Sequence, residues 1–126
     1  MKVMALDFGS ARTGVAVSDP TGVVARPVGV VEQANLAEIA DLARTEEVEE
    51  IVVGHPLTLR GERGEQARAA ERFAKALRAT VDVPVVLFDE RFTTDLAEQA
   101  PSSTPEDARA AAHLLSSYLA WAGSSR

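Results

Sequence analysis

Four carboxylate side chains stand where several of them could act together. Asp7 ends the apolar run MKVMALD, Asp89 and Glu90 follow the apolar run PVVLF, and Asp107 falls near the start of a later helical pattern. Carboxylates that converge are typical ligands of hard divalent cations. Two such cations about 4 Å apart can activate a water and stabilise the leaving oxygen in phosphodiester hydrolysis. The four acids are therefore candidates for a metal-dependent hydrolytic site.

Asp7 is the least expected of these acids. Alternation along a strand places it on the same face as the apolar side chains of Val3 and Ala5. A lone carboxylate there is costly, or has a shifted pKa, unless a positive charge compensates it. A metal would supply that compensation. The alternative is a turn in which Asp7 accepts hydrogen bonds from the amides of Ser10 or Ala11, and the residues leave both interpretations open.

The other acids have structural alternatives too. Asp107 lies in the stretch TPED, which has the order of residues typical of a helix start. Asp89 or Glu90 could pair with Arg91 or Arg12 at a strand end. Each acid taken alone is ambiguous, so the prediction of a shared site depends on whether the fold brings them together.

The hydrophobic pattern predicts a mixed α/β sheet of five strands flanked by helices. The first three strands form an antiparallel meander, and two helix-to-strand crossovers add two parallel strands. Pro27 interrupts the third strand, which suits an edge position. The predicted strands are 2–8, 14–18, 23–31, 49–54 and 84–88, and the predicted helices are 36–45, 65–81 and 105–121.

This topology would bring the acids to one edge of the sheet. Ligand sites in such sheets form at the carboxyl ends of the parallel strands, where Asp7, Asp89 and Glu90 are expected. On the last helix Asp107 shares a face with Ala111 and residues further along, so it can point toward the sheet. His55 follows a strand end at the same edge, and a single histidine there is expected to be a packing residue.

Composition narrows the class of protein. The 126 residues are most simply one domain, 1–126, and the absence of cysteine excludes disulfides and thiolate metal sites. We find no signal peptide pattern and no apolar run long enough to cross a bilayer, so we predict a cytoplasmic protein with no membrane partner. The net charge of -6 argues against a surface that attracts nucleic acid everywhere. Basic residues nevertheless cluster locally, at Arg60, Arg63, Arg68, Arg72, Lys75 and Arg78.

Four stretches together resemble the YqgF/RuvX family: LDFGSARTGVAVSD, IVVGHPLTLRGERG, VPVVLFDERFTT and DARAAAHLLSSYL. The resemblance covers nearly the whole chain in order and implies a ribonuclease H-like fold. Members are proposed to be metal-dependent nucleases that mature the 5′ end of the pre-16S ribosomal RNA, a step of ribosome biogenesis. They were earlier proposed to resolve Holliday junctions.

The resemblance also implies roles for particular residues. Asp7, Asp89, Glu90 and Asp107 would be catalytic, and Asp7, Glu90 and Asp107 would be the ligands of Mg²⁺ or Mn²⁺. Either Asp89 or Glu90 could supply the acid of the DER motif. The residues expected to contact phosphate or nucleic acid are Arg12, Arg91, Arg60 and Arg63.

Three other functions have some support from the sequence. Cleavage of DNA junctions is the alternative nuclease activity and would normally need a symmetric dimer, whereas we predict a monomer or a weak homodimer. A nucleic-acid-binding factor in ribosome assembly is favoured by the acidic segment DLAEQAPSSTPE, where relatives carry a basic loop. An actin-like or sugar-kinase ATPase is suggested by DFGSARTG, but that fold needs two lobes and the chain has room for one.

Overall fold

The computed structural model describes residues 1–93 and 106–124. The acidic segment before Asp107 and the predicted helix start at residue 105 lie outside these residues. The chain forms β1 (Val3–Asp7), β2 (Arg12–Ser18), β3 (Ala25–Glu32), α1 (Leu36–Thr45), β4 (Glu50–His55), α2 (Glu65–Arg78), β5 (Val85–Asp89), a 3-10 turn η1 (Glu90–Phe92) and α3 (Glu106–Ser124).

The five strands form one mixed sheet in the order β3-β2-β1-β4-β5. β1 pairs antiparallel with β2, which pairs antiparallel with β3, while β1, β4 and β5 run parallel. The predicted meander and the two parallel strands are confirmed, and the strand with Pro27 is at the sheet edge as expected. The register pairs Leu6 with Val53 and His55 with Asp89, so the carboxyl ends of the three parallel strands share one edge.

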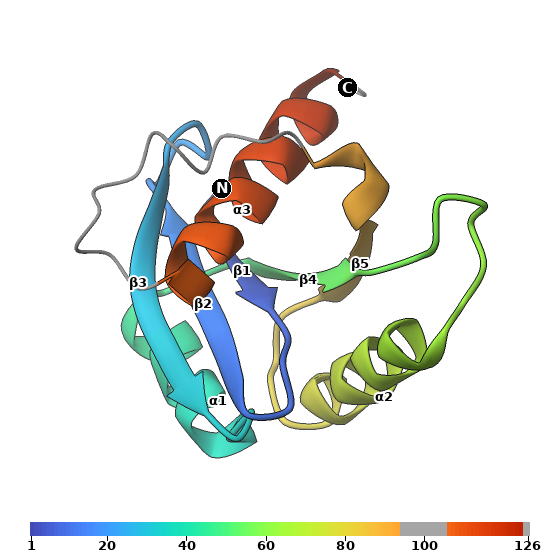
Figure 1. Ribbon diagram of the computed structural model, residues 1–126. Helices are drawn as coiled ribbons and strands as arrows, with labels where there is room; N and C mark the ends of the chain where they lie inside the picture. The colour runs from blue at the N-terminus through green and yellow to red at the C-terminus, as the bar shows by residue number, and fades with distance from the viewer. Residues whose placement is uncertain (94–105, 125–126) are drawn as a thin grey trace.

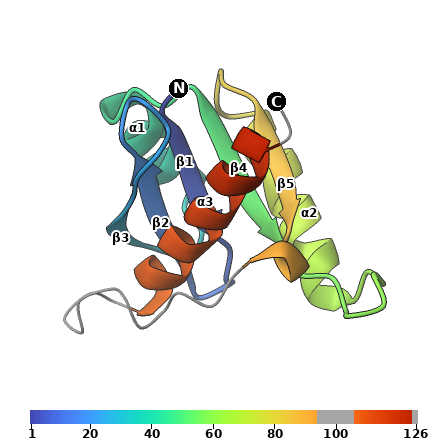
Figure 2. The ribbon, with the colours of Figure 1, turned by 90° about the horizontal axis from the view of Figure 1, so that it is seen from above.

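Helices cover both faces of the sheet. Figure 1 shows α1 and α2 on one face and α3 on the other, and Figure 2 shows α3 lying across the strands. Met4 and Leu6 are fully buried toward α1 and α2, whereas Val3 and Ala5 are buried toward α3. Burying each large aliphatic side chain contributes about 1.5 to 3 kcal/mol to the stability of the folded state. The alternation of β1 therefore places Asp7 on the face that α3 covers.

The bounds of several elements differ from the prediction. β2 begins at Arg12 instead of residue 14, because its pairing with β3 extends to Arg12 opposite Glu32. α2 ends at Arg78 instead of 81, where the amides of Thr80 and Val81 both donate to the carbonyl of Leu77 and close the last turn. α3 continues to Ser124, three residues past the predicted end.

Local capping explains where α1 begins and ends. The Asn35 side chain accepts a hydrogen bond of 3.0 Å from the Glu38 amide and caps the start of the helix. At the other end Glu47 has φ of 56°, and the amide of Val48 donates to the carbonyl of Ala43. This is a Schellman ending with a glutamate where glycine is preferred. None of the helices within the described residues is long and apolar enough to span a membrane.

Candidate active site

A cavity of about 440 Å³ opens at the carboxyl edge of β1 and β4. Two acids, Asp7 and Glu90, contribute to its wall, and Gly54 lies between their strands. The turn after β1 supplies Phe8, Gly9 and Ser10, and the first turns of α2 supply Gln66, Ala69 and Ala70. The fold thus brings together two acids that are 83 positions apart in the sequence.

Asp7 ends β1 on the partly buried face beneath α3. Burial, and to a lesser extent the nearby charge of Asp107, raise the pKa of its carboxyl from 3.8 to about 6. Within residues 1–93 and 106–124, neither the Ser10 nor the Ala11 amide donates to it. The turn that follows is held instead by the carbonyl of Ala11, which accepts from the Gln33 amide at 2.8 Å. The turn-capping alternative for Asp7 is therefore not realised.

Glu90 is the first residue of η1, immediately after β5. Its pKa is raised by burial first and then by the charge of Asp7, while His55 acts in the opposite direction. Gly54 gives the Glu90 side chain its space: a Cβ at this glycine would lie 3.0 Å from the Glu90 carboxyl carbon. Glu90 and Asp7 are therefore neighbouring carboxylates at the cavity, and in the described part of the chain neither forms an ion pair with a lysine or arginine.

Asp89 has a different environment from its neighbour. It accepts hydrogen bonds from the Arg91 guanidinium at 2.6 Å and 2.9 Å and from the Arg91 amide at 2.9 Å. These bonds lower the pKa of Asp89. The two acids of the DER motif therefore differ in position, because Glu90 lines the cavity whereas Asp89 is neutralised by Arg91.

Asp107 lies in the first turn of α3, and its backbone packs against Gly14, the residue that pairs with Asp7 across β1 and β2. Its Oδ2 lies 3.3 Å from the Nε of Arg12, in a pair that is partly exposed. The helix approaches this closely because residue 14 is glycine. A Cβ at Gly14 would lie 1.9 Å from the carbonyl oxygen of Asp107, which no side chain could tolerate. Gly14 was not among the residues predicted from the sequence.

The acids form two pairs that share Asp7, one with Glu90 and one with Asp107. Among the described residues no group of three His, Cys, Asp or Glu side chains is close enough to enclose a single ion. The donors nevertheless fit Mg²⁺ or Mn²⁺ in kind, because they are carboxylate oxygens whose mutual repulsion a divalent cation would relieve. The cavity beside Asp7 and Glu90 leaves room for water or phosphate oxygens to complete the coordination there.

Three of the four predicted phosphate-binding arginines contact acids of the chain itself. Arg12 pairs with Asp107 and Arg91 with Asp89, as described above. Arg63 donates to Glu71 through Nε at 2.8 Å and through a second, shorter bond. Arg60 is exposed, and within the described part of the chain it forms no ion pair. Of the four, Arg60 is the one whose guanidinium is free to meet a phosphate.

The expectation that His55 is merely a packing residue is incomplete. Its Nε2 lies 2.6 Å from Oε2 of Glu71, the same carboxylate that Arg63 contacts. His55, Glu71 and Arg63 therefore connect the end of β4, the second turn of α2 and the loop between them. The sequence holds one signal for this contact, because Glu71 is a carboxylate within the alanine-rich stretch ARAAERFAKA.

Comparisons with known proteins show the family to which the chain belongs. Residues 1–121 match a family model described as "RuvX: Holliday junction resolvase". A "Putative pre-16S rRNA nuclease" of Sulfurihydrogenibium sp. (strain YO3AOP1) is 38% identical over 129 residues, covering 94% of this chain and 89% of the relative. The protein of the same description from Rhodococcus opacus (strain B4) is 44% identical over 113 residues. That match covers 82% of this chain and 64% of the relative, so the chain spans less than two thirds of that relative's length.

Solved structures share the fold at low sequence identity. RuvC of Thermus thermophilus superposes with a TM-score of 0.70 at 15% identity, covering 99% of this chain and 97% of RuvC. The RuvC complex with a Holliday junction substrate gives 0.69 at 16% identity, covering 98% and 96%. The predicted ribonuclease H-like architecture is confirmed by this likeness, which at such identity concerns the fold alone.

Proposed function

The chain belongs to the RuvX family, and we propose that it is a metal-dependent endonuclease that hydrolyses phosphodiesters in structured RNA. The favoured substrate is the 5′ end of the pre-16S ribosomal RNA. The observation that carries the proposal is the pair Asp7 and Glu90, whose pKa values are both raised at the wall of an open cavity. Unneutralised carboxylates at the carboxyl edge of a sheet are suited to metal-assisted hydrolysis.

Three acids of the chain would hold the metal. Asp7 would be shared, with Glu90 completing one pair and Asp107 the other. A bound divalent cation would supply activation of a water and stabilisation of the leaving oxygen. Arg12, whose Nε lies 3.3 Å from Oδ2 of Asp107, would help to position that carboxylate. Arg91, by binding Asp89 through its amide and guanidinium, fixes the turn from which Glu90 extends.

The substrate class is supported by the relatives. Proteins 38% to 44% identical are described as nucleases of pre-16S rRNA, which favours RNA. The second candidate, resolution of four-way DNA junctions, is favoured by the description of the family model. We also propose that the protein acts in the cytoplasm, where ribosome biogenesis takes place, and as a monomer or weak homodimer.

The test is cleavage of a 5′-extended small-subunit rRNA precursor beside a four-way DNA junction, each with Mg²⁺ or Mn²⁺. We expect metal-dependent cleavage that falls about 100-fold or more in Asp7→Asn and in Glu90→Gln, the scale of losing one electrostatic contributor. Asp82→Asn, an exposed carboxylate outside the cavity, is the matched control and should cleave normally. The preferred substrate decides between RNA processing and junction resolution. Absence of cleavage of both substrates would refute the nuclease and favour a binding factor.

A further inference from the structure

The loop between β4 and α2, residues 56–64, has an ordered turn at its tip, and we call this segment the arm. The Gly61 amide donates to the carbonyl of Thr58 at 2.8 Å, and the Thr58 amide donates to the carbonyl of Glu62 at 3.0 Å. The Thr58 hydroxyl accepts from the Glu62 amide at 3.0 Å. Gly61 has φ of 82°, a conformation that favours glycine. The arm therefore has a defined tip, formed by Leu59 and Arg60.

Two sets of contacts hold the arm beside the candidate active site. At its base Arg63 binds Glu71, which also binds His55 at the end of β4. At its tip a Cβ built on Gly61 would lie 3.2 Å from Nη1 of Arg91. Arg91 is bonded to Asp89 and directly follows Glu90, so the tip packs against the turn that carries a cavity acid. Figure 1 shows the arm extending from the end of β4 away from the sheet.

Leu59 is 94% exposed at this tip. Single exposed leucines are common on protein surfaces and usually need no explanation. This leucine differs because Arg91, which follows the cavity acid Glu90, donates to its carbonyl at 3.5 Å. It also adjoins Arg60, which forms no ion pair among the described residues. Leucine is one of the side chains that wedge between base steps in nucleic acid complexes, while arginine binds the neighbouring phosphates.

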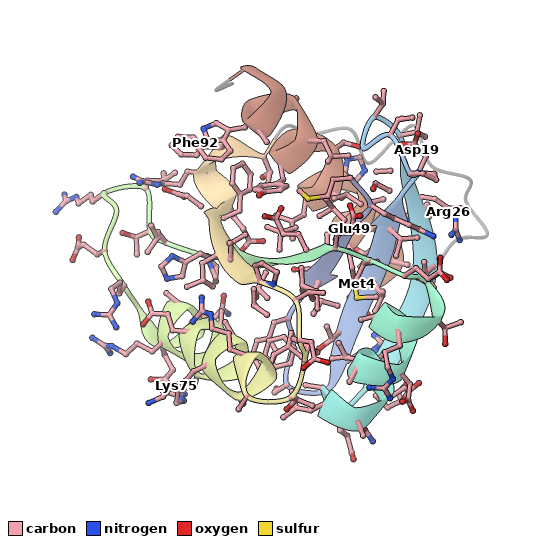
Figure 3. The ribbon with its side chains drawn as sticks, turned by 180° about the vertical axis from the view of Figure 1, so that it is seen from behind. Met4, Asp19, Arg26, Glu49, Lys75 and Phe92 are labelled. Atoms are coloured by element: carbon pink, nitrogen blue, oxygen red, sulfur yellow. The ribbon has the colours of Figure 1, made fainter. Side chains whose placement is uncertain are left out.

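The segment around the arm is positively charged, and this charge favours nucleic acid as its partner. Residues 56–78 contain six basic and three acidic side chains, in a protein whose net charge is -6. Figure 3 shows nitrogen atoms, including that of Lys75, on the side chains that extend from the arm and α2. The arm thus presents one apolar side chain within a locally basic surface, which complements bases flanked by phosphates.

We propose that Leu59 is a wedge that enters the base stack beside the phosphodiester to be cut, with Arg60 on a flanking phosphate. The wedge selects nucleic acid whose stacking is already interrupted, by a branch, bulge or helix end, over uninterrupted duplex. This inference rests on the proposed function for the position of the cut. The insertion itself can be measured without cleavage, because unstacking costs least where a helix is already broken.

The experiment uses the full chain in the Asp7→Asn background with Mg²⁺, which separates binding from cleavage. The probe is 2-aminopurine placed at the helix junction of an RNA stem, at the centre of a four-way DNA junction, and within an uninterrupted duplex. We expect binding to raise its fluorescence at least about twofold on the interrupted substrates and little on the duplex. Adding Leu59→Ser to this background should abolish the rise in fluorescence and weaken binding to interrupted substrates about 10-fold. Adding Leu59→Met instead should preserve the rise and the affinity.

Val23→Ser is the matched control, because Val23 is 73% exposed in the turn between β2 and β3, at the opposite end of the strands. It should behave as the parent protein. The wedge is refuted if Leu59→Ser leaves fluorescence and affinity unchanged. It is also refuted if the Asp7→Asn parent does not bind interrupted substrates. In either case a protein partner would be the better explanation of the exposed Leu59. The two proposals can also be separated. If Leu59 is needed for unstacking but the wild type cleaves neither substrate, the wedge is supported and the nuclease is refuted.

Discussion

Replacing Asp7 with asparagine should stabilise the metal-free protein at neutral pH, although it removes a residue of the candidate active site. The Asp7 carboxyl is partly buried and close to the charge of Asp107, and it forms no ion pair with any of the residues that the structure describes. Its pKa is therefore raised from 3.8 to about 6. The folded state holds the ionised form at a cost, which the neutral amide of asparagine avoids.

The magnitude follows from the difference between the folded and unfolded pKa. A tenfold change in proton affinity is worth about 1.4 kcal/mol, so the rise from 3.8 to about 6 corresponds to about 3 kcal/mol. Because Asp7 retains some contact with solvent, we expect about 2 kcal/mol. The folded state binds more protons than the unfolded state between pH 4 and 6. This contribution therefore lowers the stability of the wild type as the pH rises through that window.

The assay is urea unfolding of wild type and Asp7→Asn between pH 4 and 8 in EDTA. The free energy of unfolding of the mutant should exceed that of the wild type by about 2 kcal/mol above pH 7 and by much less at pH 4. Adding Mg²⁺ or Mn²⁺ at pH 8 should stabilise the wild type and leave the mutant nearly unchanged. Asp82→Asn should run parallel to the wild type throughout. A mutant less stable than the wild type at pH 8, or a difference independent of pH, would refute the reasoning.

Three further substitutions test how the fold positions the site. Gly14→Ala should destabilise the protein by about 2 kcal/mol or more in urea unfolding, because the new methyl overlaps the backbone of α3, and should abolish stabilisation by Mg²⁺. Gly54→Ala displaces only the flexible Glu90 side chain, so cleavage should fall about 10-fold while the melting temperature hardly changes. Glu47→Gly should raise the free energy of unfolding by about 1 kcal/mol with normal cleavage, since glycine suits its positive φ.

Much of the fold could be predicted because its strands and helices differ clearly in hydrophobic period. The unbroken IVV of β4 predicts a strand covered on both faces, and the two crossovers then fix the parallel order. The bounds were less predictable because they depend on partners far away in the sequence. Arg12 belongs to β2 only because Glu32 lies opposite, and no local pattern reports that pairing.

The candidate site was predictable in its residue types but not in its geometry. Alternation places Asp7 on the face beneath α3, and the strand ends place Asp89 and Glu90 at the same edge. Which of those two acids enters the cavity depends on the turn of η1 and on Arg91, which binds Asp89. Adjacent residues in an irregular turn point in directions that no period determines, so this choice required the structure.

Two glycines explain why the positions of Asp107 and Glu90 relative to Asp7 could not be predicted from the sequence. Gly14 and Gly54 both have φ outside the left-handed region, so neither is required by the conformation of its own strand. Each is required by the close approach of another segment, Asp107 to Gly14 and Glu90 to Gly54. The absence of a side chain at these two positions leaves space for both acids on the face of the sheet that α3 covers, where Asp7 also lies. Because such contacts join distant segments, a glycine inside an apparent strand beside a candidate acid indicates where a second acid enters.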